Sequence, residues 1–122
     1  MTKKVKKTNL PKFDNPVFID CDDTLILWDI SEFPKESQVV INKDWGEDDP
    51  TKIVIHQKNV NLVRKFAKLG YDIIIWSRTG RAWAEAVAKL CGVSKYVSAY
   101  MSKPNFYIDD QPCRIVTGKL PY

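Results

Sequence analysis

The residues best suited to chemistry are the acids that follow the first apolar segment of the chain. Residues 17–19 (Val-Phe-Ile) predict a buried strand, and the sequence DCDDT follows directly at residues 20–24. Clustered carboxylates are costly unless a cation or a binding partner neutralises them. Because side chains alternate along a strand, Asp20 and Asp22 point the same way and could share one hard divalent ion. The pattern therefore favours metal-assisted chemistry on a phosphate.

Two later segments also end in polar residues. Residues 72–76 predict a second buried strand that ends in the sequence SRTG, and residues 105–108 predict a last strand that ends in Asp109 and Asp110. In an open parallel sheet, the carboxyl ends of the strands lie at one edge, where ligands bind. The three polar clusters are therefore expected to share one site.

Residue types of this kind are sufficient for phosphoryl transfer. A cation held by Asp20 and Asp109 would bind a phosphoryl oxygen and offset the repulsion between phosphate and carboxylates. An aspartate beside the cation can attack phosphorus, and an acid two residues further on can protonate the leaving oxygen and then activate water. A hydroxyl such as Ser77 and a cation such as Lys103 would hold the remaining phosphoryl oxygens.

The segments FIDCDDT, IIIWSRTG, SKP and FYIDDQ, in this order, resemble the four motifs of the haloacid dehalogenase (HAD) superfamily of phosphohydrolases. The resemblance covers most of residues 16–111. It implies a phosphomonoester hydrolase that requires Mg²⁺ and forms an aspartyl-phosphate. The residues that it implies for catalysis are Asp20 as nucleophile, Asp22 as general acid and base, and Lys103 as a clamp on the phosphoryl group and the nucleophile.

The resemblance also implies binding roles. Contacts to phosphate or substrate fall to Thr24, Ser77 and Arg78, although Arg78 is equally consistent with a solvated side chain. The implied ligands of Mg²⁺ are the acids of the first and last motifs, Asp20, Asp22, Asp109 and Asp110. The chain departs from the family pattern at Asp23, where many members carry glycine.

The elements that must position these residues alternate between strand and helix. Apolar residues at helical spacing predict one helix over residues 57–69 and a second that presents Trp83 and Val87 on one stripe and ends before Gly92. With near-continuous apolar strands around them, this order predicts an α/β fold. We expect a parallel sheet flanked by helices, in the Rossmann-like arrangement of the HAD type.

One strand of this sheet is in question. Residues 96–100 are a candidate strand, but only four residues separate Tyr100 from Asn105, too few for a crossover between parallel strands. Either residues 96–100 are not a regular parallel strand or the sheet is truncated there.

The chain is predicted to form one domain over residues 16–122, preceded by a basic, flexible leader over residues 1–15. Strand-like residues 38–41 and 52–56 flank a turn-rich acidic tip, and they predict a β-hairpin flap within about residues 28–55. No insertion is long enough for a large cap domain.

The composition is that of an ordinary soluble globular protein, with 44% hydrophobic and 28% charged residues and a net charge of +4. Five lysines lie in the first twelve residues, and this arm could contact nucleic acid weakly, although a short basic terminus is more often solvated. No apolar segment approaches membrane-spanning length.

Three cysteines without metal-finger spacing favour reduced thiols and a cytoplasmic location. Cys21 lies between two acids and is expected to pack rather than react.

Among HAD proteins the lack of a cap accompanies an open site and often macromolecular or end-group substrates, so the resemblance favours nucleotides or nucleic-acid ends. The alternatives are a sugar-phosphate or phosphoprotein phosphatase, and a binding or regulatory module with this fold and no turnover. Trp28 and Trp45 lie in the predicted flap, where they either stack on a substrate ring or pack the flap. Trp76 and Trp83 are expected in the core, and His56 in a structural role.

Overall fold

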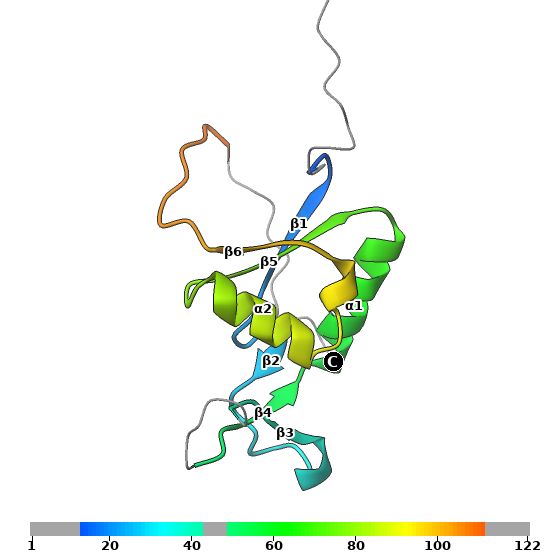
Figure 1. The fold of residues 1–122 in the computed structure, drawn as a ribbon, viewed down its shortest axis with the longest axis vertical. Helices are drawn as coiled ribbons and strands as arrows, with labels where there is room; N and C mark the ends of the chain where they lie inside the picture. Colours follow the sequence, from blue (N-terminus) through cyan, green and yellow to red (C-terminus); the bar gives the residue numbers. More distant parts are fainter. Residues whose placement is uncertain (1–12, 43–48, 112–122) are drawn as a thin grey trace, which may run out of the picture.

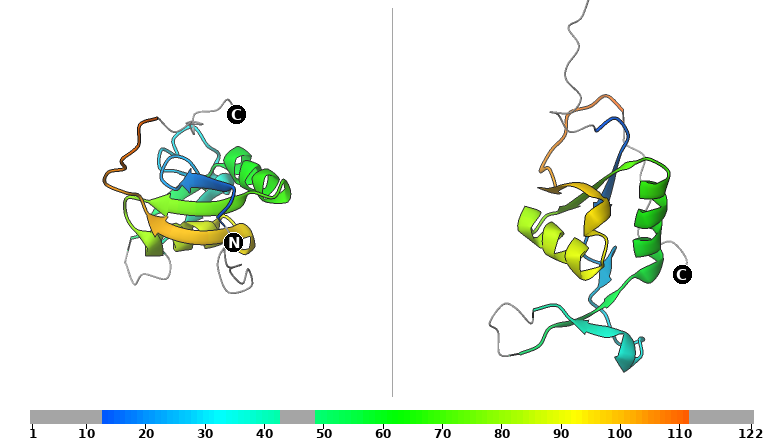
Figure 2. Two further views of the ribbon diagram at one scale, coloured as in Figure 1. Left: turned by 90° about the horizontal axis from the view of Figure 1, so that it is seen from above. Right: turned by 45° about the vertical axis from the view of Figure 1, so that its right-hand side comes forward.

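The computed structural model describes residues 13–42 and 49–111, which form two small sheets and two helices (Figure 1). Strands β1 (Pro16–Asp20), β5 (Asp72–Ser77) and β6 (Val97–Ser102) make a parallel sheet in the order β1-β5-β6. They lie side by side in Figure 2, and their carboxyl ends meet at one edge. The structure therefore has a mixed α/β architecture. Of the candidate strand over residues 96–100, residues 97–100 belong to a parallel strand whose register shifts between Ile73 and Ile74 of β5, and Tyr96 belongs to the turn before it.

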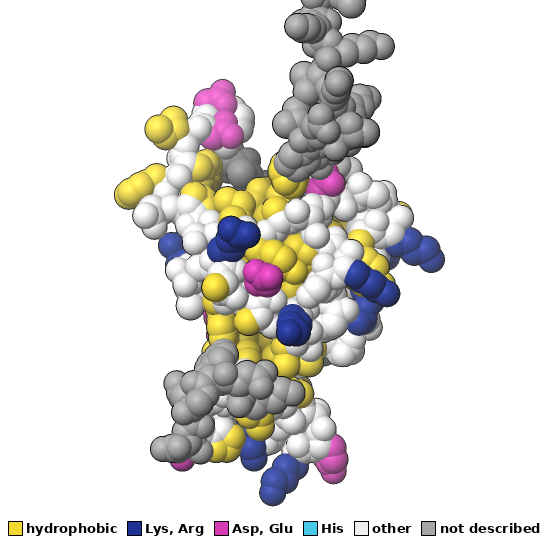
Figure 3. All heavy atoms as spheres, viewed as in Figure 1, with side chains coloured by type: hydrophobic (Ala, Val, Ile, Leu, Met, Phe, Trp, Pro, Cys, Tyr) yellow, Lys and Arg dark blue, Asp and Glu magenta, His cyan; other side chains and the backbone are white. Residues whose placement is uncertain are grey.

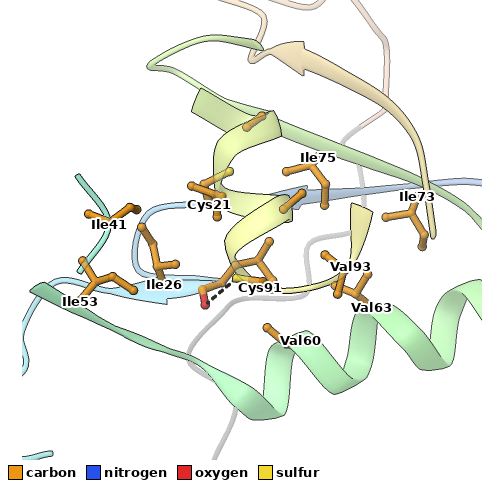
Figure 4. Close-up of a cluster of buried hydrophobic side chains, with 14 residues drawn as sticks. Cys21, Ile26, Ile41, Ile53, Val60, Val63, Ile73, Ile75, Cys91 and Val93 are labelled. Carbon is orange, nitrogen blue, oxygen red and sulfur yellow. Dashed lines mark hydrogen bonds between the residues drawn. The ribbon is translucent and has the colours of Figure 1, made fainter. Parts of the chain in front are cut away.

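The two helices pack against one face of this sheet. Helix α1 (Gln57–Lys68) follows β4 and leads into β5, and helix α2 (Arg81–Leu90) connects β5 to β6. Successive right-handed crossovers that step in the same direction across a sheet place their helices on the same side. The buried cluster drawn in Figure 4 accordingly joins residues of both helices to alternate residues of β5, among them Val60, Val87 and Ile75.

The opposite face of the parallel sheet is only partly covered by the described residues. Side chains alternate between the two faces, so Phe18, Trp76 and Met101 point away from the buried cluster. Phe18 and Met101 are 43% and 37% exposed, and the rings of Phe18 and Trp76 contact each other with centroids 4.5 Å apart. Trp76 thus lies on this second face and not in the main core.

The predicted flap is present as an antiparallel sheet, which lies at the bottom of Figure 1, beyond the loop that follows β1. Strand β3 (Gln38–Val40), which follows the short 3₁₀ helix Lys35–Ser37, pairs with β4 (Lys52–Ile55), as the sequence predicted. The structure adds strand β2 (Ile26–Leu27) on the other side of β4. The flap sheet is therefore tied directly to the loop that follows β1.

The prediction of a last strand over residues 105–108 is wrong. In the structure this segment is not paired, and Phe106, Tyr107 and Ile108 are 89%, 64% and 102% exposed. The cause is chain length, because β6 extends to Ser102 and only two residues then precede Asn105. A crossover between parallel strands needs a dozen residues or more.

A second 3₁₀ helix (Ser94–Tyr96) leads into β6. Across the described residues, neither α1 nor α2 has the length and apolar character needed to cross a membrane. The predicted leader up to residue 12, Trp45 and Cys113 lie outside the described residues.

Candidate active site

The carboxyl edge of the parallel sheet brings Asp20 and Lys103 together. The backbone N–H of Lys103 donates to the carbonyl of Ser77 at 3.1 Å, which holds the chain after β6 against the end of β5. From there the Nζ of Lys103 lies 3.0 Å from Oδ1 of Asp20, and the two side chains are 24% and 29% exposed. The predicted nucleophile and the predicted clamp thus form a partly shielded ion pair, which is stronger than a fully solvated one.

The loop after β1 fixes the second oxygen of Asp20. Thr24 Oγ1 donates to Asp20 Oδ2 at 3.2 Å, so each carboxylate oxygen has one partner. The loop is held in shape because the N–H groups of residues 24–26 all point at the carbonyl of Cys21, at 2.9 to 3.2 Å. Asp23 completes the turn with φ of 58°, a left-handed conformation that aspartate tolerates and glycine adopts freely. Its Oδ1 accepts a hydrogen bond from the N–H of Trp28 at 3.3 Å, so the aspartate here also ties the loop to the flap.

Cys21 is a packing residue, as predicted. It is fully buried, and burial together with the neighbouring charges of Asp20 and Asp22 raises the pKa of its thiol to about 12. A thiol with this pKa holds almost no thiolate at neutral pH, and the thiolate is the reactive form. Cys21 is therefore poorly suited to act as a nucleophile at neutral pH.

Asp22 is held by two tryptophans. Trp28 Nε1 donates to Oδ1 at 2.9 Å, and Trp83 Nε1 donates to Oδ2 at 3.3 Å. The two indoles are nearly parallel, with an angle of 13° between their planes and 6.3 Å between their centroids. Trp28 is 40% exposed, whereas Trp83 is partly buried against the core. The expectation that Trp83 serves the core is therefore incomplete, because its polar edge orients the second acid of the site.

The start of α1 supports the same loop from behind. His56 caps this helix by accepting the N–H of Asn59 on Nδ1 at 3.1 Å, which is the structural role predicted for it. The His56 N–H donates to the carbonyl of Leu25, and the side chain of Asn59 donates to the carbonyl of Thr24, both at 2.9 Å. Sequence reasoning missed Asn59, whose only signal was a polar residue on the apolar stripe of α1. These bonds fix the acidic loop to a rigid element.

The polar residues after β5 differ in their exposure to solvent. Ser77 is fully buried, and its Oγ accepts the N–H of Thr79 at 3.1 Å, so this hydroxyl shapes the turn and has no exposed surface for a phosphate. Arg78 and Thr79 are exposed. Gly80 has φ of 123°, a conformation that favours glycine, and it starts α2 directly after the turn.

The predicted set of four metal-ligating acids is not assembled in the described residues. Asp109 and Asp110 lie on the exposed segment after β6, and within residues 13–42 and 49–111 no three acids, histidines or cysteines form a group that could hold a metal ion. Asp20 and Asp22 supply oxygen ligands of the type that Mg²⁺ prefers, but they form only half of the predicted set. No catalytic step is therefore assigned to an ion.

Comparisons of the chain with models of known protein families, with curated proteins and with solved structures find no match.

Proposed function

We propose that this protein hydrolyses phosphate monoesters through an aspartyl-phosphate on Asp20. The observation that carries the proposal is the contact between Lys103 Nζ and Asp20 Oδ1 at 3.0 Å, at the carboxyl edge of a parallel sheet. In α/β sheets this edge is where ligands bind. A lysine there could attract an anionic phosphoryl group and hold it against the carboxylate.

The first half of the proposed reaction is attack by a carboxylate oxygen of Asp20 on phosphorus, which forms a new O–P bond while the bond to the leaving oxygen breaks. Asp22 donates a proton to that leaving oxygen. In the second half Asp22 takes a proton from water, and the water oxygen attacks phosphorus while the bond between phosphorus and the Asp20 oxygen breaks. This step releases inorganic phosphate and regenerates the Asp20 carboxylate and the protonated Asp22. Lys103 offsets negative charge on the phosphoryl oxygens in both halves.

The contacts of Asp22 are compatible with this proton transfer. Each oxygen of a carboxylate has two lone pairs, and each tryptophan donor occupies one of them, on Oδ1 and Oδ2. One lone pair on each oxygen is left to carry the transferred proton. The two indoles therefore fix the position of Asp22 without blocking its chemistry.

The substrates that we propose are nucleotides or phosphorylated nucleic-acid ends. Trp28 is 40% exposed at the point where the chain enters the flap, and its indole also contacts Asp22. A base or other flat ring stacked on this indole would gain about 1–3 kcal/mol. The observation supports a substrate with a ring near the phosphate over a hexose phosphate or a phosphoserine.

The proposal is tested by measuring phosphate release from nucleoside monophosphates, 3′- and 5′-phosphorylated oligonucleotides, hexose phosphates and phosphopeptides, with added Mg²⁺. Asp20→Asn should abolish turnover, and Lys103→Met should lower kcat/KM by roughly 10²–10³-fold. Glu85→Gln and Lys89→Met, which change exposed residues of α2, serve as matched controls that should leave the rate unchanged. A near-wild-type rate in Asp20→Asn would show that Asp20 is not the nucleophile.

Trp28 separates the substrate classes in the same assay. Trp28→Ala should raise KM for nucleotides more than for hexose phosphates, whereas Trp28→Phe should restore most of the difference because it keeps an aromatic face. Equal effects of Trp28→Ala on both substrates would remove the stacking role.

One set of observations favours a second function, a phosphate-binding module without turnover. Both oxygens of Asp20 are already engaged by the protein itself, the hydroxyl of Ser77 is buried, and the predicted metal ligands are not assembled. Such a module would bind a non-hydrolysable phosphonate analogue in calorimetry and release no phosphate from the corresponding ester.

A further inference from the structure

The described structure has an open strand edge at β1 and an exposed apolar segment after β6, and the two are complementary. Strand β1 lies at the edge of the parallel sheet, with β5 on one side and no described strand on the other. Residues 105–108 form an exposed apolar segment, in which Phe106 and Ile108 are 89% and 102% exposed. An open strand edge pairs readily with another strand, and residues such as Phe, Tyr and Ile favour strands.

The two segments are also similar in sequence. Strand β1 reads PVFID, and residues 105–109 read NFYID, so both have five residues and both end in Ile-Asp. If the second segment lay parallel to β1 and in register with it, Asp109 would lie beside Asp20. The acids that follow both segments would then meet at the carboxyl edge of the sheet.

A single chain cannot make this parallel pairing. The backbone of Lys103 is held at the carboxyl edge by its 3.1 Å hydrogen bond to Ser77, yet a strand parallel to β1 has to begin at the opposite edge. The two residues before Asn105 span about 7 Å, whereas a six-residue strand such as β5 is about 20 Å long. The segment could reach its own β1 only in the antiparallel direction, which would carry Asp109 to the wrong edge.

We propose that residues 105–110 of one copy add as a parallel strand to the free edge of β1 in a second copy, and that the exchange is reciprocal. Each candidate active site would then combine Asp20, Asp22 and Lys103 of one chain with Asp109 and Asp110 of the other. Reciprocal exchange of an identical element closes into a symmetric dimer.

The exposed surface is sufficient for such a dimer. The segment after β6 projects at the upper left of Figure 3, where yellow and magenta side chains extend away from the rest of the described residues. Burying an aromatic side chain removes about 150–250 Å² from water, so two aromatics from each copy contribute on the order of 600–1,000 Å². With the partner surface added, the interface passes the roughly 1,000 Å² that a specific contact needs. Phe18, 43% exposed on β1, adds apolar surface at the same place.

Sedimentation equilibrium of the full chain tests the exchange without any assay of activity. The wild-type protein should be a dimer, and the double variant Phe106→Ser, Ile108→Ser should be a monomer. Leu69→Ser, which removes a side chain 65% exposed at the end of α1, is the matched control and should stay dimeric. A monomeric wild-type protein would overturn the proposal. A double variant that stays dimeric would overturn it as well.

Mixing of inactive variants tests whether the sites are shared between copies, and this arm rests on the proposed phosphatase function. Asp20→Asn and Asp109→Asn should each be inactive alone. After subunit exchange in an equal mixture, half of the dimers combine the two variants and carry one intact site, so about one quarter of the wild-type rate should return. A mixture that stays inactive beside an active wild-type protein would overturn the exchange. A wild-type protein that is inactive on every substrate would refute the proposed function instead, and sedimentation would still decide the exchange.

Discussion

His56 should make the stability of this protein depend on pH in a narrow and assignable window. It is the single histidine of the chain, it is 2% exposed, and it caps α1 through an unprotonated Nδ1 that accepts the N–H of Asn59. Burial lowers the pKa of its imidazole below the ordinary value of 6.5. Protonation of Nδ1 would also remove the acceptor that caps the helix.

Proton linkage sets the direction in which the free energy of unfolding changes with pH. As the pH falls below about 6.5, the unfolded chain binds a proton at His56 that the folded protein still excludes, so the free energy of unfolding decreases. The decrease continues until the pH reaches the lowered pKa of the folded state. If the folded imidazole stays neutral throughout, the loss between pH 7.5 and pH 5.5 is about 1.4 kcal/mol, which is the upper limit for one histidine with the ordinary pKa in the unfolded chain.

Urea unfolding at pH 7.5, 6.5 and 5.5, followed by tryptophan fluorescence, measures this loss directly. His56→Asn supplies the matched comparison, since asparagine also caps helices and does not titrate in this range. The wild-type protein should lose up to about 1.4 kcal/mol more than His56→Asn on going from pH 7.5 to pH 5.5. Equal losses in the two proteins would show that His56 titrates normally in the folded state and would refute the reasoning.

The remaining predictions concern a tryptophan, the buried thiols and the cation. Trp83→Phe removes one hydrogen bond to the carboxylate of Asp22 while keeping a ring, and kcat should fall on the order of 10-fold with little change in KM; an unchanged kcat would exclude the positioning role. Cys21 and Cys91, whose thiol pKa values burial raises to about 12, should resist iodoacetamide at pH 8 in the native protein and react after unfolding in urea, as followed by mass spectrometry of labelled peptides. If the proposed exchange brings Asp109 and Asp110 beside Asp20, excess EDTA should abolish phosphate release and Mg²⁺ should restore it; activity that persists in EDTA would exclude a metal-dependent mechanism.

Those parts of the fold that depend on local pattern could be predicted from the sequence. The apolar strand before Asp20, the helix over residues 57–69 and the hairpin of the flap each have a periodicity or turn signal within a short window, and each is present. The meeting of Asp20 and Lys103 could be expected as well, because parallel strands deliver their carboxyl ends to one edge.

The contacts that depend on side-chain direction could not be predicted in this way. Trp83 lies on the apolar stripe of α2, and a stripe does not reveal that the indole N–H reaches Asp22. Ser77 follows a strand as a phosphate-binding hydroxyl would, yet its Oγ is turned into its own loop. Both are questions of orientation, which three-dimensional packing decides and spacing along the chain does not.

The segment after β6 shows how local preference and chain connectivity can disagree. Residues 105–108 have the composition of a strand, and the sequence predicts one there, but Lys103 can pair with Asp20 only while the chain is held at the carboxyl edge of the sheet. The backbone hydrogen bond from Lys103 to Ser77 positions Lys103 for this ion pair. The same bond therefore prevents the segment from starting a parallel strand within its own molecule. Both features can be satisfied if the strand forms between molecules, because a second copy can place the start of its β1 beside the short link after Ser102. The short link that truncates the sheet within one chain would thereby direct the apolar segment to a second chain.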